Sequence, residues 1–243
     1  MTNLFNTYLY EPILSILVYI YNNLAFHDLG VSVILLTVLI RVVLFPLFYK
    51  GAKDQSLMQR LQPHIKKIQL DHKDNREEQA KQLLSLYKEH KLNPFSGVFL
   101  LLIQLPILIA LYQVFFKGIS GGVFDNHGFL GLIDLGEKSL ILTIVAAALQ
   151  YVQGKLSLPP KSSGEENAIA RSGRMMVMIG PILTLVILTN FPAALGLYWS
   201  VTTLFSLGQQ IIINKKINIK EHGKTTRENT NNTENDGAHN KPH

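Results

Sequence analysis

Apolar residues gather into five long stretches that polar segments separate. The stretches cover residues 29–49, 95–116, 140–153, 175–189 and 193–213. A helix needs about 20 mostly apolar residues to cross a bilayer, and the first, second and fifth stretches reach that length. The third and fourth stretches are shorter, so their boundaries are less sharply defined. The pattern predicts an all-α, polytopic membrane protein with five transmembrane helices.

The composition supports a membrane protein over a soluble domain. Of the 243 residues, 47% are hydrophobic and only 16% are charged, and the charges lie between the apolar stretches. The absence of cysteine excludes disulfides, thiolate metal sites, cysteine nucleophiles and a lipid-modified amino-terminal cysteine. The first residues lack the basic segment and cleavage site of a secretory signal, so we expect the spans themselves to direct membrane insertion.

A further apolar segment, residues 12–21, is about ten residues long and ends at Asn22 and Asn23. This length suits an interfacial amphipathic helix better than a membrane span. A sixth span is the alternative. It would place the amino terminus in the cytoplasm although residues 1–28 carry no positive charge.

The distribution of positive charge predicts the topology. Residues 1–28 and 118–137 contain no Lys or Arg, whereas residues 50–91 contain ten. Basic residues are enriched in cytoplasmic loops, so the amino terminus is predicted outside and the carboxyl terminus inside the cell. An odd number of spans satisfies this arrangement. We predict an extracytoplasmic segment at 1–28, a five-span core at 29–213 and a disordered, basic cytoplasmic tail at 214–243.

Within the core, residues 50–92 are predicted to form a cytoplasmic helical hairpin. Apolar residues recur at helical spacing in its first half, and residues 71–75 interrupt the pattern. Asn75 and Glu78 have the spacing of a helix-capping pair for the second half. A solvated spacer between spans is at least as good an interpretation of the hairpin as a docking site.

The first apolar stretch contains one charged residue, Arg41, near its middle. An arginine at that depth costs about 2.5 to 3.5 kcal/mol on insertion scales. Guanidinium also cannot become neutral by losing its proton. No Asp or Glu falls within the five stretches. Thr37 lies one helical turn before Arg41, and Gln104 lies in the second stretch. An unpaired arginine and several polar side chains at membrane depth predict a shared, water-filled space.

Simpler roles compete with this interpretation for the other polar residues. A single transmembrane Gln or Thr usually makes an interhelical hydrogen bond, which we regard as an equal alternative for Gln104 and the better one for Gln113 and Gln150. Tyr198 and Trp199 could belong to the aromatic belt at the membrane surface. The spacing of the eight histidines matches no metal site.

Several segments together resemble the YidC family of membrane protein insertases. They are ILLTVLIRVVLFPL, MQRLQPHIKKIQ, LYKEHKLNPFSG, LLIQLPILIALYQV and FPAALGLYWSVTTLFSLGQQ, and they follow the family's order. Departures from the usual bacterial pattern are Val98 in place of cysteine, Leu100 in place of proline and Trp199 in place of a second tyrosine. The resemblance extends over residues 29–213 and makes the chain look like a minimal insertase core.

The resemblance implies five helices around a hydrophilic groove that opens to the cytoplasm and to lipid. It places the groove arginine at Arg41, and it assigns substrate contacts to a set of residues from three spans: Thr37, Gln104, Leu105, Pro106, Tyr198 and Trp199. It implies no cofactor. The implied partners are nascent membrane proteins, the ribosome, membrane lipids, the Sec translocon and the signal recognition particle receptor, but not DNA.

We therefore expect a bacterial cell-membrane insertase, not an enzyme. No nucleophile arrangement, nucleotide loop or metal site is present in the sequence. A small anion channel or transporter around Arg41 is the main alternative. A structural assembly factor, which binds spans without inserting them, is a third possibility.

Overall fold

The computed structural model describes the backbone of residues 2–156 and 168–239 and the side chains of most residues from 4 to 156 and from 177 to 218. Its helices are α1 Thr2–Phe5, the π-helix η1 Asn6–Tyr10, α2 Glu11–Asn23, α3 Leu29–Val43, α4 Phe45–Arg60, α5 Gln62–Asp71, α6 Arg76–Glu89, α7 Ser96–Ser120, α8 Leu140–Leu156, α9 Ala168–Leu188 and α10 Ala193–His239. Between α7 and α8, two strands of two residues each, β1 Gly128–Phe129 and β2 Ile133–Asp134, pair in an antiparallel ribbon. The fold is thus almost entirely helical, as the apolar pattern predicts.

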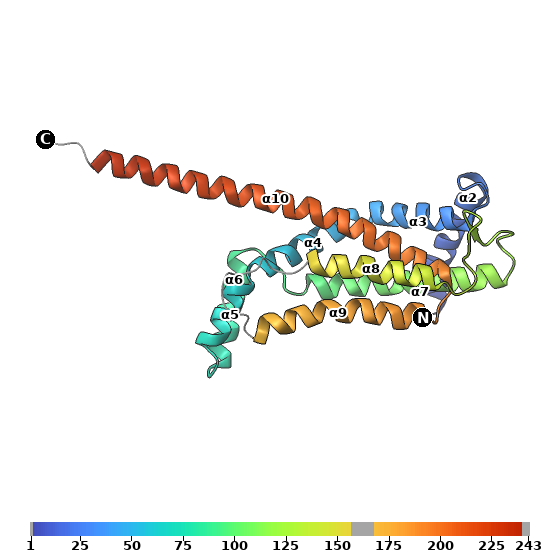
Figure 1. The fold of residues 1–243 in the computed structure, drawn as a ribbon, viewed down its shortest axis with the longest axis horizontal. Coiled ribbons are helices and arrows are strands. Elements are labelled where there is room, and N and C mark those ends of the chain that lie inside the picture. Colours follow the sequence, from blue (N-terminus) through green and yellow to red (C-terminus); the bar gives the residue numbers. More distant parts are fainter. Residues whose placement is uncertain (1, 157–167, 240–243) are drawn as a thin grey trace.

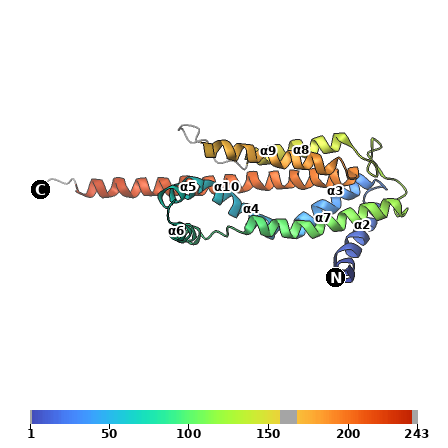
Figure 2. The same ribbon diagram turned by 90° about the horizontal axis from the view of Figure 1, so that it is seen from below.

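The long helices α3, α7, α8, α9 and the first half of α10 form an elongated bundle (Figure 1). The central helix is α10, which packs against α3, α4, α7, α8 and α9. Helices α5 and α6 lie at one end of the bundle, and α2 lies at the opposite end with the loop between α7 and α8 (Figures 1 and 2). We refer to these as the hairpin end and the loop end.

By length and composition, α7 is the one helix among the described residues that can cross a membrane unbroken. Helices α3 and α4 meet the same criterion only together, across a bend of 73°. Helix α8 and the segment Val177–Leu188 of α9 are shorter apolar helices. Five membrane spans therefore remain a prediction for this chain.

The prediction of one unbroken helix over residues 29–49 is wrong, because the chain bends between α3 and α4 within this range. Helix α3 ends at Val43, and Leu44 has φ −89° and ψ 5°. Pro46 has no N–H to continue the α3 hydrogen-bond ladder, and its ring disfavours a straight helix through this point. The backbone N–H of Phe48 donates to the carbonyl of Leu44 at 3.1 Å and restarts the ladder in α4. Arg41 consequently lies in the last turn of α3, not mid-helix.

The amino-terminal segment lies obliquely across the bundle at the loop end (Figure 2). One face of α2 is buried against α3 and α7 through Ile13, Leu17, Ile20 and Tyr21. Its other face exposes Ile16 and Tyr19. Helix α2 is thus amphipathic in its burial, and its position at a membrane interface stays a prediction.

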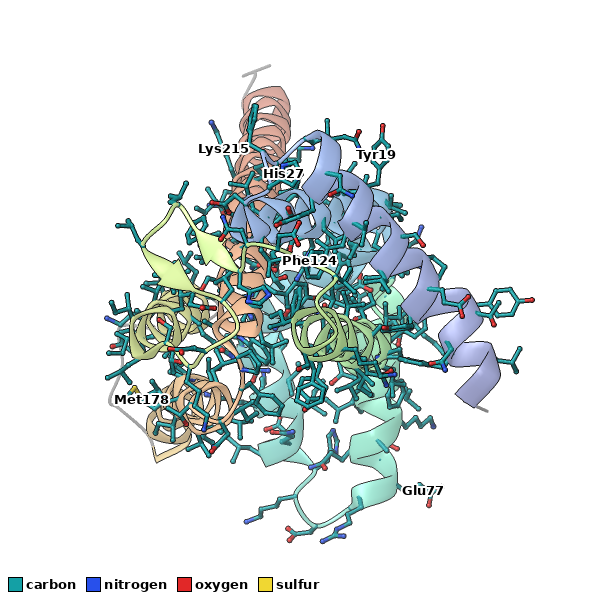
Figure 3. The ribbon with its side chains drawn as sticks, turned by 90° about the vertical axis from the view of Figure 1, so that its right-hand side faces the viewer. Tyr19, His27, Glu77, Phe124, Met178 and Lys215 are labelled. Carbon is teal, nitrogen blue, oxygen red and sulfur yellow. The ribbon has the colours of Figure 1, made fainter. Side chains whose placement is uncertain are left out.

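Loop residues cover the loop end of the bundle. Figure 3 looks at this end, with Phe124 near the centre and Tyr19 and Met178 pointing outward. The Asn126 N–H donates to the Tyr21 hydroxyl at 2.9 Å, and the Leu130 N–H donates to the Asp28 carboxylate at 2.7 Å. Asp28 also caps α3 by accepting from the Val31 N–H at 2.8 Å. These bonds hold the loop over the helices.

Two paired helices lie within the predicted hairpin, whose cytoplasmic location stays a prediction. Helix α5 ends at Asp71 and α6 begins at Arg76, and the Asn75 side chain caps α6 by accepting from the Glu78 N–H at 3.1 Å. A small core forms between the two helices from Leu61, Ile65 and Leu92, with Leu83, Leu86 and Tyr87 against it.

The tail differs from the prediction. The polar composition after about Lys216 predicts disorder, but α10 continues as a helix to His239 (Figure 1). This part of α10 projects away from the bundle in both views (Figures 1 and 2). No proline interrupts the sequence between Ala193 and His239, so nothing in the backbone forces α10 to end with the bundle.

Candidate functional site

Arg41 is buried at the junction of α3 and α4. Its side chain is only 6% exposed, and its guanidinium carbon lies 4.3 Å from the centre of the Phe48 ring. Phe48 closes the first turn of α4, so the bend at Leu44 returns the ring to the arginine. A desolvated guanidinium gains about 2 kcal/mol or more from such an aromatic face. The carboxyl end of α3 also carries a partial negative charge that favours a cation.

Polar residues of α3 and α10 lie near Arg41, and a residue of α7 bonds to one of them. Tyr198 of α10 is 3% exposed and lies near Arg41. The Gln104 amide of α7 donates a hydrogen bond to the Tyr198 hydroxyl. Thr37 lies one turn before Arg41 and donates to the Val33 carbonyl at 2.6 Å. We call Arg41, Thr37, Gln104 and Tyr198 the Arg41 cluster.

Among the side chains that the structure describes, no carboxylate pairs with Arg41. The described neighbours of the cation are therefore neutral: the Phe48 ring, Tyr198 and the carbonyl end of α3. A buried cation with only such neutral partners is poised to attract an anionic group that enters the site. This is the main chemical property of the cluster.

Leu105 and Pro106 do not join the cluster, because successive helix residues point about 100° apart. Both are exposed on the outside of α7, where Leu102 and Ile109 also lie. Gln104 points inward from the same turn and is half-buried. This turn of α7 thus carries one polar side chain toward α10 and two apolar ones outward.

Trp199 points to a different part of the bundle than Tyr198. Its indole N–H donates to the Gln150 side-chain oxygen of α8 at 3.0 Å. The Thr184 hydroxyl of α9 donates to the same oxygen. We call Gln150, Thr184 and Trp199 the Gln150 cluster. The interhelical hydrogen bond that is the better interpretation of Gln150 is confirmed. Thr184 is missed by the sequence interpretation, although a threonine in the middle of an apolar stretch is a usable signal.

A second polar contact lies toward the hairpin end, between α4 and α10. The Gln210 amide donates to the Ser56 hydroxyl at 2.7 Å, and both side chains are buried. Asp54 and Gln209 are buried in the same region of the two helices. The sequence interpretation missed Ser56 and Asp54, because it treats this part of the chain as solvated hairpin.

Two cavities lie at the loop end, away from the Arg41 cluster. One of about 430 Å³ is lined by residues of the loop and the ribbon, including His127 and Asp134. Another of about 530 Å³ lies between α7 and the connection from α9 to α10, beside Tyr112 and Phe191. In the part of the chain that the structure describes, no group of His, Asp and Glu is arranged to hold a metal ion.

Comparison with known proteins places this arrangement in a family. A family model described as 60Kd inner membrane protein matches residues 20–221. The membrane protein insertase MisCA of Bacillus subtilis is 36% identical over 212 residues, which cover 85% of this chain and 77% of that protein. The membrane protein insertase YidC of Clostridium acetobutylicum is 38% identical over 195 residues, which cover 77% and 74% of the two chains.

A longer relative is matched over about a third of its length. The membrane protein insertase YidC of Francisella tularensis subsp. novicida is 32% identical over 186 residues, which cover 76% of this chain and 32% of that protein. The match to the family model includes both polar clusters and the hairpin. The chain belongs to the 60Kd inner membrane protein family, the family of the YidC membrane protein insertases.

Proposed function

We propose that this protein inserts nascent membrane proteins into the bacterial cell membrane, with the Arg41 cluster as the site that receives their polar segments. The observation that carries the proposal is the buried Arg41, with which no described carboxylate pairs. Tyr198 of α10 lies near it and is hydrogen-bonded to Gln104 of α7. The names of the relatives, membrane protein insertases, support the same function. No catalytic residue is assigned, because insertion requires no covalent step.

The proposed topology places the loop end outside the cell and the hairpin end in the cytoplasm. The supporting observation is the charge difference between residues 1–28, which have no Lys or Arg, and the hairpin, which has many. A client then approaches the Arg41 cluster from the hairpin end, through a hydrophilic groove bordered by α3, α7 and α10. The α4–α10 contact of Ser56 with Gln210 lies on that side of the cluster.

In this mechanism, an acidic group in a client's short polar segment is attracted to Arg41. The attraction is stronger there than in water, because a Coulomb energy of about 1 kcal/mol at 4 Å in bulk water rises to about 4 kcal/mol at an effective dielectric constant of 20. Thr37, Gln104 and Tyr198 supply hydrogen-bonding groups for the segment's backbone. The client's apolar span follows along the exposed side of α7, past Leu105 and Pro106. Burial of about 20 apolar residues in lipid then drives release.

The hairpin and the carboxyl-terminal helix are the proposed contacts for the ribosome. Exposed basic side chains of the hairpin include Lys67, Lys73, Arg76, Lys81 and Lys88. Such a surface attracts the phosphates of ribosomal RNA. The Sec translocon and the signal recognition particle receptor are further proposed partners at this end.

Insertion by the purified protein in liposomes tests the function. A single-span client with a short outer segment is synthesised in their presence, and protection of that segment from protease measures its transfer. We expect protection with the wild type, loss for acidic segments with Arg41→Ala, and retention with Arg41→Lys. Equal protection in empty liposomes, or no effect of Arg41→Ala on any acidic segment, would contradict the proposed role of the cluster.

The same liposomes test the alternative of an anion pathway, which the buried, unpaired Arg41 also favours. A channel predicts flux of a halide through the protein without any client. The insertase predicts client protection and no such flux.

A further inference from the structure

The cavity of about 530 Å³ lies at the loop end, where α7 and α9 finish and α8 and α10 begin. Its volume is within the range of about 300 to 1,000 Å³ that is typical of small-molecule sites. Three aromatic residues line it, and the centre of the Tyr112 ring lies 5.8 Å from that of Phe116 and 5.3 Å from that of Phe191. Aromatic residues of membrane proteins are enriched at the level of the lipid headgroups. Under the predicted topology, the cavity therefore lies where a headgroup can enter it.

Two opposite charges line the same cavity without pairing with the protein. Glu137 and Lys138 are adjacent in the chain, and both side chains are exposed. Within the described ranges, neither side chain has a hydrogen-bond, ion-pair or ring partner. Only the backbone of Glu137 is used in the fold, because its carbonyl accepts from the Ala193 N–H at 2.7 Å. The carboxylate and the ammonium group are thus available to a ligand that carries both a cation and an anion.

Asn190 adds a hydrogen-bond acceptor to the cavity. Its amide nitrogen donates to the Val186 carbonyl at 2.9 Å. Its amide oxygen accepts no hydrogen bond from the residues that the structure describes. A primary ammonium group has three N–H donors, and carboxylate and amide oxygens accept from it. Together with Glu137, Asn190 thus offers oxygen acceptors for such a group, and the neighbouring ring faces also attract a cation.

Exposed apolar side chains lead away from the cavity along two helices. On α7, Ile109 and Leu105 lie about one and two turns before the cavity, and both are exposed. On α9, Val186 and Leu183 occupy the corresponding positions and are also exposed. Contiguous apolar surface of this kind marks contact with a membrane or a partner. Acyl chains that extend from a headgroup in the cavity would cover these side chains.

We infer that this cavity binds a phospholipid whose headgroup carries a primary ammonium group, as in phosphatidylethanolamine. Glu137 and Asn190 receive the ammonium, Lys138 pairs with the phosphate, and the acyl chains lie along α7 and α9. A quaternary ammonium has no N–H to donate to the two oxygens, and a phosphoglycerol headgroup has no cation. The site therefore prefers phosphatidylethanolamine over phosphatidylcholine and phosphatidylglycerol. The inference concerns a lipid and not a client, so it is independent of the proposed function.

Native mass spectrometry of the full chain in detergent tests this preference. The protein is mixed with equal amounts of the three phospholipids, all with the same acyl chains, and the first bound lipid is identified. We expect phosphatidylethanolamine to be enriched about tenfold, the ratio that one hydrogen bond to a charged group produces. Equal binding of the three lipids, or a preference for either of the other two, would overturn the inference.

Side-chain variants test the assigned contacts. Glu137→Gln removes the charge of an exposed side chain and should abolish the preference for phosphatidylethanolamine. The matched control is Asp125→Asn, because Asp125 is an exposed carboxylate that lines the other loop-end cavity. Lys138→Gln should weaken binding of all three lipids alike, whereas Lys155→Gln at the hairpin end of α8 should not. An unchanged preference in Glu137→Gln would contradict the assigned ammonium site.

Glycerophosphoethanolamine distinguishes a lipid site from a site for a soluble compound. It carries the same headgroup but has no acyl chains. At equal concentration we expect it to displace no bound phosphatidylethanolamine, because it lacks the apolar contacts on α7 and α9. Displacement at equal concentration would overturn the assignment to a lipid and indicate a soluble ligand.

Discussion

Arg41 and Phe48 face each other across a helix break, with 4.3 Å between the guanidinium carbon and the ring centre. The two residues are seven positions apart and belong to different helices. Their contact exists because Pro46 bends the chain by 73° between α3 and α4. The bend thus gives the buried arginine an aromatic partner in place of a carboxylate.

Phe48→Leu tests the value of this contact. Loss of a desolvated cation–π contact removes about 2 kcal/mol, so the thermal midpoint of unfolding in nanodiscs should fall. Phe48→Tyr keeps an aromatic face and should restore most of the loss. The control is Phe45→Leu in the same part of α4, because Phe45 is 41% exposed. Equal destabilisation by Phe45→Leu and Phe48→Leu would show that the contact with Arg41 adds nothing to the stability of the fold.

The Ser56–Gln210 bond should stabilise the packing of α4 on α10. Ser56→Ala leaves a buried amide donor without its acceptor and should cost about 1 to 3 kcal/mol. Gln210→Leu in the same chain removes the unsatisfied donor, so the double variant should be more stable than the sum of the two single effects predicts. Ser206→Ala is the control, since Ser206 bonds the Thr202 carbonyl of its own helix. Strict additivity in chemical unfolding would contradict the described bond.

Gly30 should be essential for closing the loop end. A Cβ atom there would lie 2.1 Å from the Phe129 ring, closer than packed atoms allow. Gly30→Ala should therefore displace the ribbon and destabilise the fold by about 1 to 3 kcal/mol. Gly97→Ala is the matched control near the start of α7, because no atom lies within 4 Å of its added Cβ. Protease resistance of the loop should fall only in Gly30→Ala. Comparable resistance in both variants would exclude the close contact.

Local pattern was sufficient to predict the helices but not their partners. Apolar runs and the Asn75 cap mark where helices lie, because these signals act within a few residues. The bonds that define the two clusters join residues 94 and 49 positions apart, Gln104 with Tyr198 and Gln150 with Trp199. Such pairs depend on which faces of separate helices meet, and one sequence does not contain that information.

Two further differences between the prediction and the structure have local causes in the sequence. They are the position of Arg41 in its helix and the different directions of Tyr198 and Trp199. Pro46 follows Arg41 within the first apolar stretch, and it moves the arginine from the middle of a helix to its end. Adjacent residues of one helix diverge by about 100°, and Tyr198 and Trp199 accordingly bond to different helices, α7 and α8. The residues after Lys216 lack the apolar pattern that predicts a packed helix. Helix α10 nevertheless continues through them, because no proline ends it.

Site-specific photocrosslinking to a stalled nascent membrane protein tests the central claim most directly. A photoreactive residue is placed at Thr37, at Gln104 or at Leu105, and the control position is Ile141, an exposed apolar residue of α8. We expect client crosslinks from the three positions on α3 and α7 and none from Ile141. Crosslinks no stronger than those from Ile141 would contradict a client path past Arg41.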